Sequence, residues 1–453
     1  MTRAVLLSVA FTLASPAFAA VDFSLTAFLR QKEGYSWKFE SREEKKDYTI
    51  HVLRLRSQTW QTPATVDQPI WEHELRLTIP HKLRHSTALV HVRGGKIGTP
   101  FLGAEPVLVD TAISSGTILA ELSLVPVQPI QFALEERQRS EDAIIAYTWK
   151  KFLETKETSW PLHLPMAKAI VRSMDCVQEY CRSQKIDQPV NFVLMGESKR
   201  AWASWLTASS DPRVAALVPI VCDFLNVKHT YTNHYRSLGG WSPAIRDYLA
   251  EGIDEKVIHN PDFAELLQIE DPYSYRDAYT MPKFLIHSSG DPFSCPDSSH
   301  FYFSDLPSPK YLRYLPNTGH LLPRDDVFSS ASAFYLSLVE KKPLPRIAWK
   351  RHEDGSLSTT TDTTPLKITI WKAINPDARD FRFDFTKVRW QSESMAVQKN
   401  GIYQVPPPRI EKGWAAYFVE YAFKHPLSAD LPPMIFTTEV VITPNTLPFA
   451  FPQ

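Results

Sequence analysis

Several features are scarce in this sequence of 453 residues, and each scarcity excludes a class of protein. Net charge is absent, because 50 Lys and Arg residues balance 50 Asp and Glu residues, so no overall field attracts nucleic acid. Glycine is sparse, at 15 residues against 36 prolines, which favours ordered loops over flexible linkers. No apolar run after residue 20 is long enough to span a membrane, so we expect a soluble mature chain.

Metal-ligand patterns are also lacking. His229 and His234 lie five residues apart, but no Asp, Glu or Cys at a fixed spacing completes a ligand set. His73 and His287 are predicted to be structural. We therefore expect no metal and no other cofactor.

The first residues have the pattern of an export signal. Arg3 is a short basic head, residues 4–13 form an apolar run, and Ala17-Phe18-Ala19 is an A-x-A cleavage site. We predict a signal peptide over residues 1–19, a mature chain that starts at Ala20 or Val21, and a periplasmic or secreted location. The alternative is an uncleaved N-terminal membrane anchor, although the apolar run is short for one.

The remaining chain changes character near residue 343. Before it, an antiparallel meander is followed by short apolar strands that alternate with helices. This pattern predicts an α/β domain over residues 20–342 with a mostly parallel sheet covered on both faces. A helical insertion, about residues 224–281, is expected to form a cap. Residues 343–453 show short strand-like runs without a convincing long helix, which predicts a β-sandwich of immunoglobulin-like outline.

The most informative segment follows the apolar strand at residues 190–195. Here the chain turns through Gly196-Glu197-Ser198 and enters a helix that begins with Lys199. A serine on such a sharp turn between strand and helix has its hydroxyl raised above the sheet, as in a nucleophile elbow. Ser198 is therefore the candidate nucleophile. The alternative is that Ser198 only caps the helix N-terminus.

A serine nucleophile needs a base and an acid that orients the base. In α/β-hydrolases the chain order is Ser, then acid, then His. Asp291 follows the strand at residues 283–287, and His320 follows the strand at residues 311–315, so both are expected at the carboxyl edge of the sheet. Asp297, in the same loop as Asp291, is the alternative acid.

The oxyanion hole needs two backbone N–H donors. We expect one from Lys199, the residue after the nucleophile, and the second from Gly94 and Gly95, which follow the buried strand at residues 88–92. The alternative for the two glycines is an ordinary turn.

These residues stand among longer signatures that resemble the PhoPQ-activated pathogenicity-related protein family, a branch of the α/β-hydrolases. The signatures are Leu55-Arg56-Ser57-Gln58-Thr59-Trp60, Trp71-Glu72-His73, Gln138-Arg139-Ser140-Glu141-Asp142, Gly196-x-Ser198-Lys199-Arg200-x-Trp202, Asp211-Pro212-Arg213-Val214, Leu238-Gly239-Gly240-Trp241-Ser242, Gly290-Asp291, Pro296-Asp297-Ser298-Ser299, Pro316-Asn317-Thr318-x-His320 and Ala378-Arg379-Asp380-Phe381. The similarity extends from about residue 35 to the C-terminus. Two departures are Ala201, where the family usually has Gly, and Glu197, where it has a small residue.

The resemblance implies the fold, the export and the positions of the triad. The family's relation to prolyl-oligopeptidase-like hydrolases implies peptide substrates, with aminopeptidase or dipeptidyl-peptidase activity, and its name implies a link to virulence or envelope stress. The alternative activity, an esterase that acts on a small ester, is left open by the sequence. The competing interpretation is a binding or signalling protein on a hydrolase scaffold whose chemistry is reduced or lost, an alternative that Glu197 leaves open. In either case the β domain could bind a protein or an envelope partner.

Four cysteines complete the candidates. Cys176 and Cys181 fall in one predicted helix, too far apart for a bridge. Cys222 and Cys295 each follow a strand of the sheet, and these strands are expected to be neighbours. We predict a disulfide between Cys222 and Cys295 that fixes the acid loop. The alternative is two buried free thiols.

Overall fold

The computed structural model describes residues 23–100, 103–133, 135–425 and 427–452. The predicted signal peptide, residues 1–19, lies outside these ranges. No helix within them is both long and apolar enough to cross a membrane.

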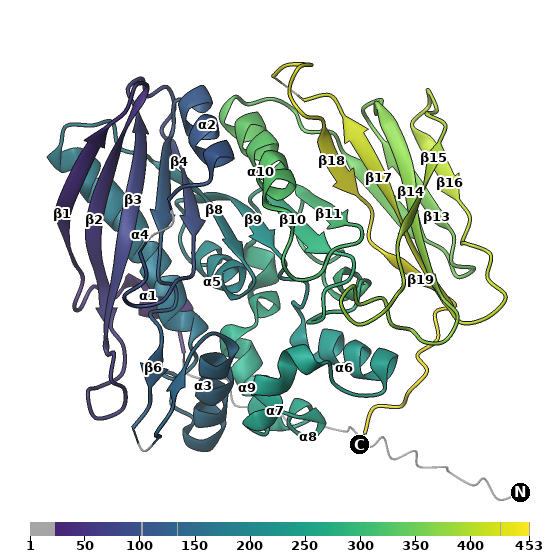
Figure 1. Ribbon diagram of the computed structural model, residues 1–453, viewed down its shortest axis with the longest axis horizontal. Coiled ribbons are helices and arrows are strands. Elements are labelled where there is room, and N and C mark those ends of the chain that lie inside the picture. The colour runs from purple at the N-terminus through teal and green to yellow at the C-terminus, as the bar shows by residue number, and fades with distance from the viewer. Residues whose placement is uncertain (1–22, 101–102, 134, 426, 453) are drawn as a thin grey trace, which may run out of the picture.

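A nine-stranded sheet forms the centre of the molecule (Figure 1). Its strand order is β1-β2-β3-β5-β4-β8-β9-β10-β11. The first three strands and β5 pair antiparallel, whereas every neighbour from β5 to β11 is parallel. The strands are β1 (Ser36–Glu44), β2 (Tyr48–Thr59), β3 (Ile70–Pro80), β4 (Thr87–Val92), β5 (Ile118–Leu122), β8 (Asn191–Glu197), β9 (Val214–Ile220), β10 (Lys283–Ser288) and β11 (Lys310–Leu315).

Helices cover both faces of this sheet. Along β8, Phe192 and Leu194 pack into the cluster that holds α4 and α5, whereas Val193 and Met195 pack into the cluster that holds α2 and α10. This alternation is expected of a strand, because successive side chains point to opposite faces. The four helices are α2 (Pro106–Ser115), α4 (His163–Ser183), α5 (Lys199–Ala208) and α10 (Arg324–Val339).

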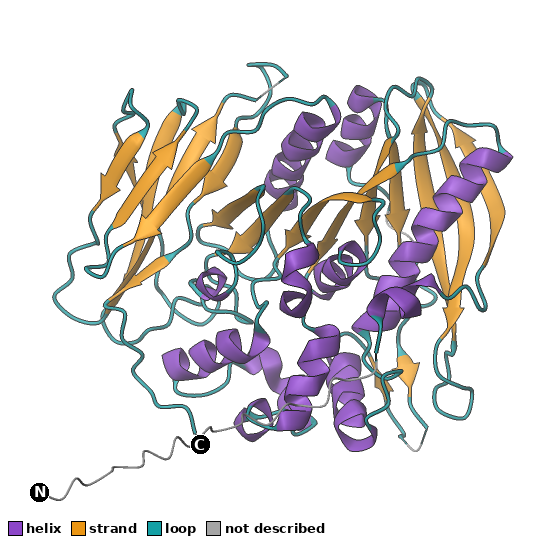
Figure 2. Cartoon of the chain, turned by 180° about the vertical axis from the view of Figure 1, so that it is seen from behind, coloured by secondary structure: helices purple, strands orange, loops and turns teal. Residues whose placement is uncertain are grey.

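The chain between β9 and β10 is helical, and its elements gather with α3 below the sheet in the views of Figures 1 and 2. Helix α3 is Asp142–Thr155. The elements between β9 and β10 are α6 (Val227–Leu238), η1 (Pro243–Ile245), α7 (Arg246–Ala250), α8 (Glu255–Ile258), α9 (Pro261–Glu270) and η2 (Pro272–Ala278). Smaller elements elsewhere are α1 (Leu25–Arg30), β6 (Ile130–Gln131), β7 (Gln138–Arg139) and η3 (Ser298–Phe301).

After α10 the chain forms two antiparallel sheets, at the right of Figure 1. The smaller has the order β12-β13-β16, and the larger has the order β15-β14-β17-β18 with β19 on β17. Tyr403 of the smaller sheet and Tyr421 of the larger meet with ring centroids 5.9 Å apart, so the sheets share one core. The strands are β12 (Ile347–Arg351), β13 (Leu357–Thr361), β14 (Lys367–Asn375), β15 (Gln391–Met395), β16 (Ile402–Val405), β17 (Trp414–Phe423), β18 (Met434–Thr437) and β19 (Val441–Thr443).

The C-terminal sheets pack directly on the end of the central sheet. Phe436 of β18 lies against Phe284 and Tyr311, with ring centroids 5.2 and 4.9 Å away. The Tyr314 amide of β11 donates to the Thr437 hydroxyl at 3.0 Å. The two parts therefore share apolar and polar contacts along β11, the last strand of the sheet.

Candidate active site

Ser198 lies on a strained turn between β8 and α5. Its backbone has φ 56° and ψ −124°, a region that non-glycine residues rarely occupy. The strand and helix approach so closely that a Cβ on Gly196 would lie 2.9 Å from the carbonyl group of Arg200. The Ser198 amide donates to the Ile220 carbonyl at 2.8 Å, which fixes the turn to β9. The sequence thus builds the elbow that it predicts for a nucleophile.

Asp291 and His320 form a hydrogen-bonded pair beyond the ends of β10 and β11. His320 Nδ1 lies 2.7 Å from Asp291 Oδ2, and the Phe293 amide donates to the other carboxylate oxygen at 2.9 Å. Asp291 is 4% exposed and the His320 side chain 21%. Burial alone would lower the pKa of His320, but the charge and hydrogen bond of Asp291 outweigh it and raise that pKa above its ordinary value.

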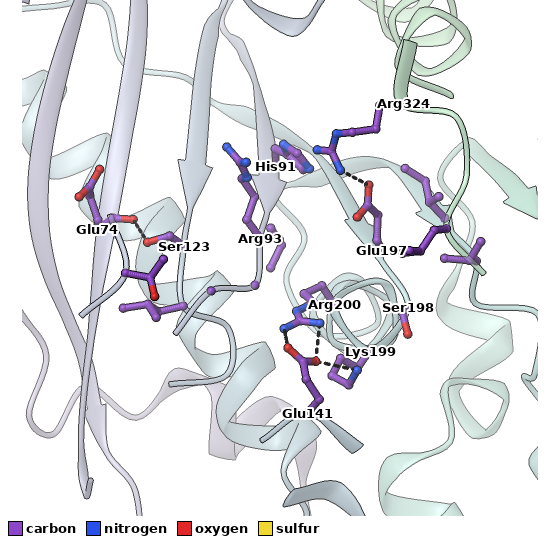
Figure 3. A pocket seen from close by; sticks show the side chains of 18 of the residues that line it. Glu74, His91, Arg93, Ser123, Glu141, Glu197, Ser198, Lys199, Arg200 and Arg324 are labelled. Atoms are coloured by element: carbon purple, nitrogen blue, oxygen red, sulfur yellow. Dashed lines mark hydrogen bonds and ion pairs between the residues drawn. The ribbon is translucent and has the colours of Figure 1, made fainter. Parts of the chain in front are cut away.

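Ser198 and His320 line one cavity of about 930 Å³. Figure 3 shows this cavity and labels Ser198. Within the described ranges no hydrogen bond joins the Ser198 hydroxyl to the imidazole. The cavity is also lined by charged side chains, among them Arg54, Glu74, Arg93, Glu197 and Arg324.

The three predicted oxyanion-hole residues, Gly94, Gly95 and Lys199, line the same cavity. The Gly94 carbonyl accepts from the Leu124 amide at 3.1 Å, and the Gly95 carbonyl accepts from Gln128 Nε2 at 2.9 Å. Both carbonyls are thus held by the segment after β5. The Lys199 amide belongs to the first turn of α5, where N–H groups have no partner inside the helix.

Comparison with known proteins assigns the family. The model of the PhoPQ-activated pathogenicity-related proteins matches residues 25–382. The chain belongs to this family. It is also 34% identical over 442 residues to autocrine proliferation repressor protein A of Dictyostelium discoideum, a match that covers 92% of this chain and 89% of that protein.

The fold of this family member is shared with a solved structure. Acetyl xylan esterase 1 from Thermoanaerobacterium sp. JW/SL YS485 superposes with a TM-score of 0.50 at 13% identity, covering 69% of this chain and 92% of that one. An acetyl xylan esterase from Paenibacillus sp. R4 gives 0.49 at 12% identity, covering 70% and 92%. The predicted α/β-hydrolase fold with C-terminal β-sheets is confirmed.

An ion-pair network beneath the elbow was missed by the sequence analysis, although its members fall in the family signatures. The Arg200 guanidinium binds both oxygens of Glu141 at 2.8 Å and the Val125 carbonyl at 2.6 Å (Figure 3). Lys199 Nζ lies 2.8 Å from the same carboxylate. Burial would raise the pKa of Glu141, but Arg200 and Lys199 outweigh it and lower that pKa.

Arg200 also explains Gly94. A Cβ on Gly94 would lie 2.5 Å from Arg200 Nη2, so this position needs glycine for the close approach of the guanidinium. Arg200 therefore braces the predicted oxyanion loop against the helix that follows the nucleophile. The signal for this role was present in the sequence as an arginine two residues after the serine.

The alternative acid, Asp297, is used elsewhere in the structure. Its carboxylate pairs with Arg379 at 2.6 Å and accepts a hydrogen bond from Asn233 Nδ2 at 3.2 Å. All three residues are buried. Asp291, not Asp297, carries the contact to His320. The geometry therefore favours Asp291 as the acid.

The predicted disulfide between Cys222 and Cys295 is wrong, because both thiols are free and buried. Strands β9 and β10 are neighbours, as expected, but neighbouring strands do not ensure that two side chains beyond them face each other. Cys295 interacts with the Ser237 hydroxyl, whereas Cys222 lies near the carboxyl groups of Asp223 and Asp271. Burial raises the pKa of both thiols, that of Cys295 to about 12.

Glu197 is a half-exposed carboxylate on the cavity wall next to Ser198. Its side chain is 40% exposed, and Arg324 Nη1 lies 3.8 Å away. Arg324 also donates from Nε to Glu105 at 2.9 Å. Glu197 thus faces the cavity and an arginine, on the side away from Lys199 in Figure 3.

Proposed function

We propose that this chain is an exported serine hydrolase that transfers acyl groups through Ser198, His320 and Asp291. The observation that carries the proposal is the hydrogen bond of His320 to the buried Asp291, together with the cavity that His320 shares with a serine held on a strained elbow. Each feature alone has structural explanations. Together they meet the requirements of a nucleophile, a base and an orienting acid.

In this mechanism the Ser198 oxygen attacks a carbonyl carbon and its proton moves to His320 Nε2. His320 donates from Nδ1 to Asp291, which stabilises the imidazolium. The amides of Lys199 and the Gly94-Gly95 loop donate to the oxyanion. His320 then gives the proton to the leaving group, and water repeats the sequence to release the acyl product. Ser198 closes on His320 when the substrate is bound, because catalytic hydrogen bonds commonly shorten at that stage.

The proposed substrate is a peptide or a small ester. A cavity of about 930 Å³ is at the upper end of the range of small-molecule sites. The family's relation to peptidases favours cleavage near a free N-terminus, and the fold that the chain shares with an acetyl xylan esterase keeps ester substrates open. The proposed export is tested by sequencing the N-terminus of the mature chain, which is expected to begin at Ala20 or Val21.

A fluorophosphonate probe tests the proposed nucleophile. The wild-type chain is expected to be labelled at Ser198, and Ser198→Ala to lose all labelling. Ser123→Ala is the matched control, because Ser123 lines the same cavity and should not react. A panel of aminoacyl, dipeptidyl and short-chain ester substrates then separates peptidase from esterase. Folded wild-type protein that stays unlabelled would contradict the proposal.

Two features of the site favour a second candidate, a binding or signalling protein with reduced chemistry. Ser198 has no hydrogen bond to His320 within the described residues, and Glu197 places a carboxylate beside it. The relative in Dictyostelium discoideum is named for repression of proliferation. In this case the cavity or the C-terminal sheets would bind a partner, and turnover would be absent from the whole substrate panel.

A further inference from the structure

One loop of the C-terminal sheets touches both loops that carry the candidate acid and base. It comprises residues 379–390 between β14 and β15, and we call it the clamp segment. The Phe383 amide donates to the Gly290 carbonyl at 2.9 Å, directly before Asp291. Asn317 exchanges two hydrogen bonds with the backbone of Trp390, at 2.9 and 2.7 Å. The clamp segment thus bonds to the chain close to both catalytic candidates.

Two glycines lie against the clamp segment, and one of them makes room for its backbone. Gly290 and Gly319 directly precede Asp291 and His320, and neither has a positive φ. A Cβ on Gly290 would lie 2.7 Å from the Phe383 amide nitrogen. A Cβ on Gly319 would lie 2.6 Å from an Asp384 carboxylate oxygen. At residue 290 glycine is therefore required by the close approach of the clamp-segment backbone and not by backbone conformation, whereas the contact at Gly319 is with the end of the exposed Asp384 side chain, which can move.

The clamp segment is itself fixed at both ends. At its start, the buried Arg379 guanidinium binds Asp297 and the Ser237 hydroxyl, each at 2.6 Å. At its end, the Trp390 ring lies 5.1 Å from the Phe418 ring of β17. The first anchor lies in the α/β part of the chain and the second in the C-terminal sheets, so the clamp segment is attached to both parts.

The acid and base loops are also tied to each other. The Ser288 hydroxyl donates to the Thr318 carbonyl at 2.7 Å, and the Thr318 hydroxyl donates to Ser288 at 3.1 Å. A displacement of one loop is therefore transmitted to the other.

We infer that the clamp segment positions the Asp291–His320 pair, and that Asn317, through its two bonds to Trp390, is a positioning residue for catalysis. The inference rests on the proposed function. On this inference the C-terminal sheets contribute to the active site, because the clamp segment sets the separation of Asp291 and His320. None of the clamp residues lines the cavity, so they act only through the loops that they touch.

Asn317→Gly is the decisive variant. It removes both bonds to Trp390, and glycine tolerates the positive φ of 55° at this position. We expect kcat to fall roughly 10-fold with KM unchanged, because a small misplacement of catalytic groups slows the chemical step. The acid limb of the kcat/KM profile should move to lower pH, since His320 loses part of its interaction with Asp291. Asn317→Asp keeps the acceptor for the Trp390 amide and should recover part of both effects.

Thr437→Val is the matched control. It removes one hydrogen bond between the same two parts of the chain, the bond from the Tyr314 amide. We expect a lower Tm with kcat and the pH profile unchanged. If Asn317→Gly and Asn317→Asp also change only Tm, the clamp segment has a structural role alone and the inference is overturned.

A titration of the His320 ring by NMR separates this inference from the proposed function. The groups that act on this ring are Asp291, Lys199 and Asp142, and His320→Gln assigns its signals. Asn317→Gly should lower the pKa of His320, whether or not the chain turns over a substrate. Unlabelled wild-type protein with this pKa shift would refute only the proposed function. Labelled protein without the shift would refute only the clamp.

Discussion

Ser198 and His320 face one cavity, but the contacts that hold Ser198 in place come from a nearer part of the chain than those that hold the Asp291–His320 pair. The elbow is local, because β8, the turn and α5 follow each other within residues 191–208 and Gly196 packs on Arg200. The acid and base are held by contacts to a segment more than 60 residues further along the chain. The nucleophile therefore depends on contacts within the α/β part of the chain, including the bond from Ser198 to Ile220, whereas the acid–base pair depends on the assembly of both parts of the protein.

The largest expected effect comes from removing the carboxylate that binds His320. Asp291→Asn should lower kcat by about 10⁴-fold, because the asparagine amide donates to Nδ1 and leaves His320 in the wrong tautomer. Burial would still lower the pKa of His320 and the opposing charge would be gone. Residual activity should therefore show its acid limb at lower pH. Steady-state kinetics from pH 5 to 9 with the best substrate of the panel measure both effects.

Asp297→Asn is the control for that variant, since it lies in the same loop and also removes one carboxylate. It leaves the buried Arg379 without its partner, which costs about 3–5 kcal/mol of unfolding free energy. Urea denaturation should report that loss, and the acid limb should move less than in Asp291→Asn, because Asp297 anchors only one end of the clamp segment. A shifted limb in Asp297→Asn, with a wild-type limb in Asp291→Asn, would reverse the assignment of the acid.

A smaller effect is expected on the elbow side. Arg200→Lys loses the two-oxygen contact to Glu141, because an ammonium group cannot present two parallel donors. The Gly94 loop loses its brace, and we expect kcat to fall roughly 10-fold through a weaker oxyanion hole. The acid limb should stay in place, since Asp291 and His320 are untouched. A shift of that limb as large as in Asn317→Gly would show that the two sides are not independent.

The same contrast explains which features could be predicted from the sequence. The Gly-x-Ser turn and the order of Asp291 and His320 after successive strands follow from local patterns, and they place these residues at one edge of the sheet. The choice between Asp291 and Asp297 does not, because the partner of Asp297 lies 82 residues away. The disulfide was predicted wrongly for a related reason, since strand adjacency places the ends of β9 and β10 side by side but does not place Cys295, which lies seven residues beyond the end of β10.

A buried carboxylic acid, Asp223, also contacts the strands that precede Asp291 and His320. Asp223, just beyond β9, accepts hydrogen bonds from Tyr302 and Tyr314, each at 2.6 Å. Tyr302 also lies 3.0 Å from His287 Nε2, so this group touches both β10 and β11 from within. Burial raises the pKa of Asp223 to about 8, against the opposing effect of the two tyrosine hydroxyls.

The smallest expected effect therefore concerns stability and leaves kcat unchanged. Between pH 4 and pH 8 the folded chain keeps the Asp223 proton while the unfolded chain releases it, so this group lowers stability as pH rises. Asp223→Asn removes the titration and keeps a donor and an acceptor for the tyrosines. Its unfolding free energy should exceed that of the wild type by about 1 kcal/mol or more at pH 8, and by less at pH 5. Asp377→Asn, which loses an exposed carboxylate, should leave the difference between the two pH values as in the wild type. Equal pH dependence in Asp223→Asn and wild type would mean that the carboxyl group is already ionised in the folded chain.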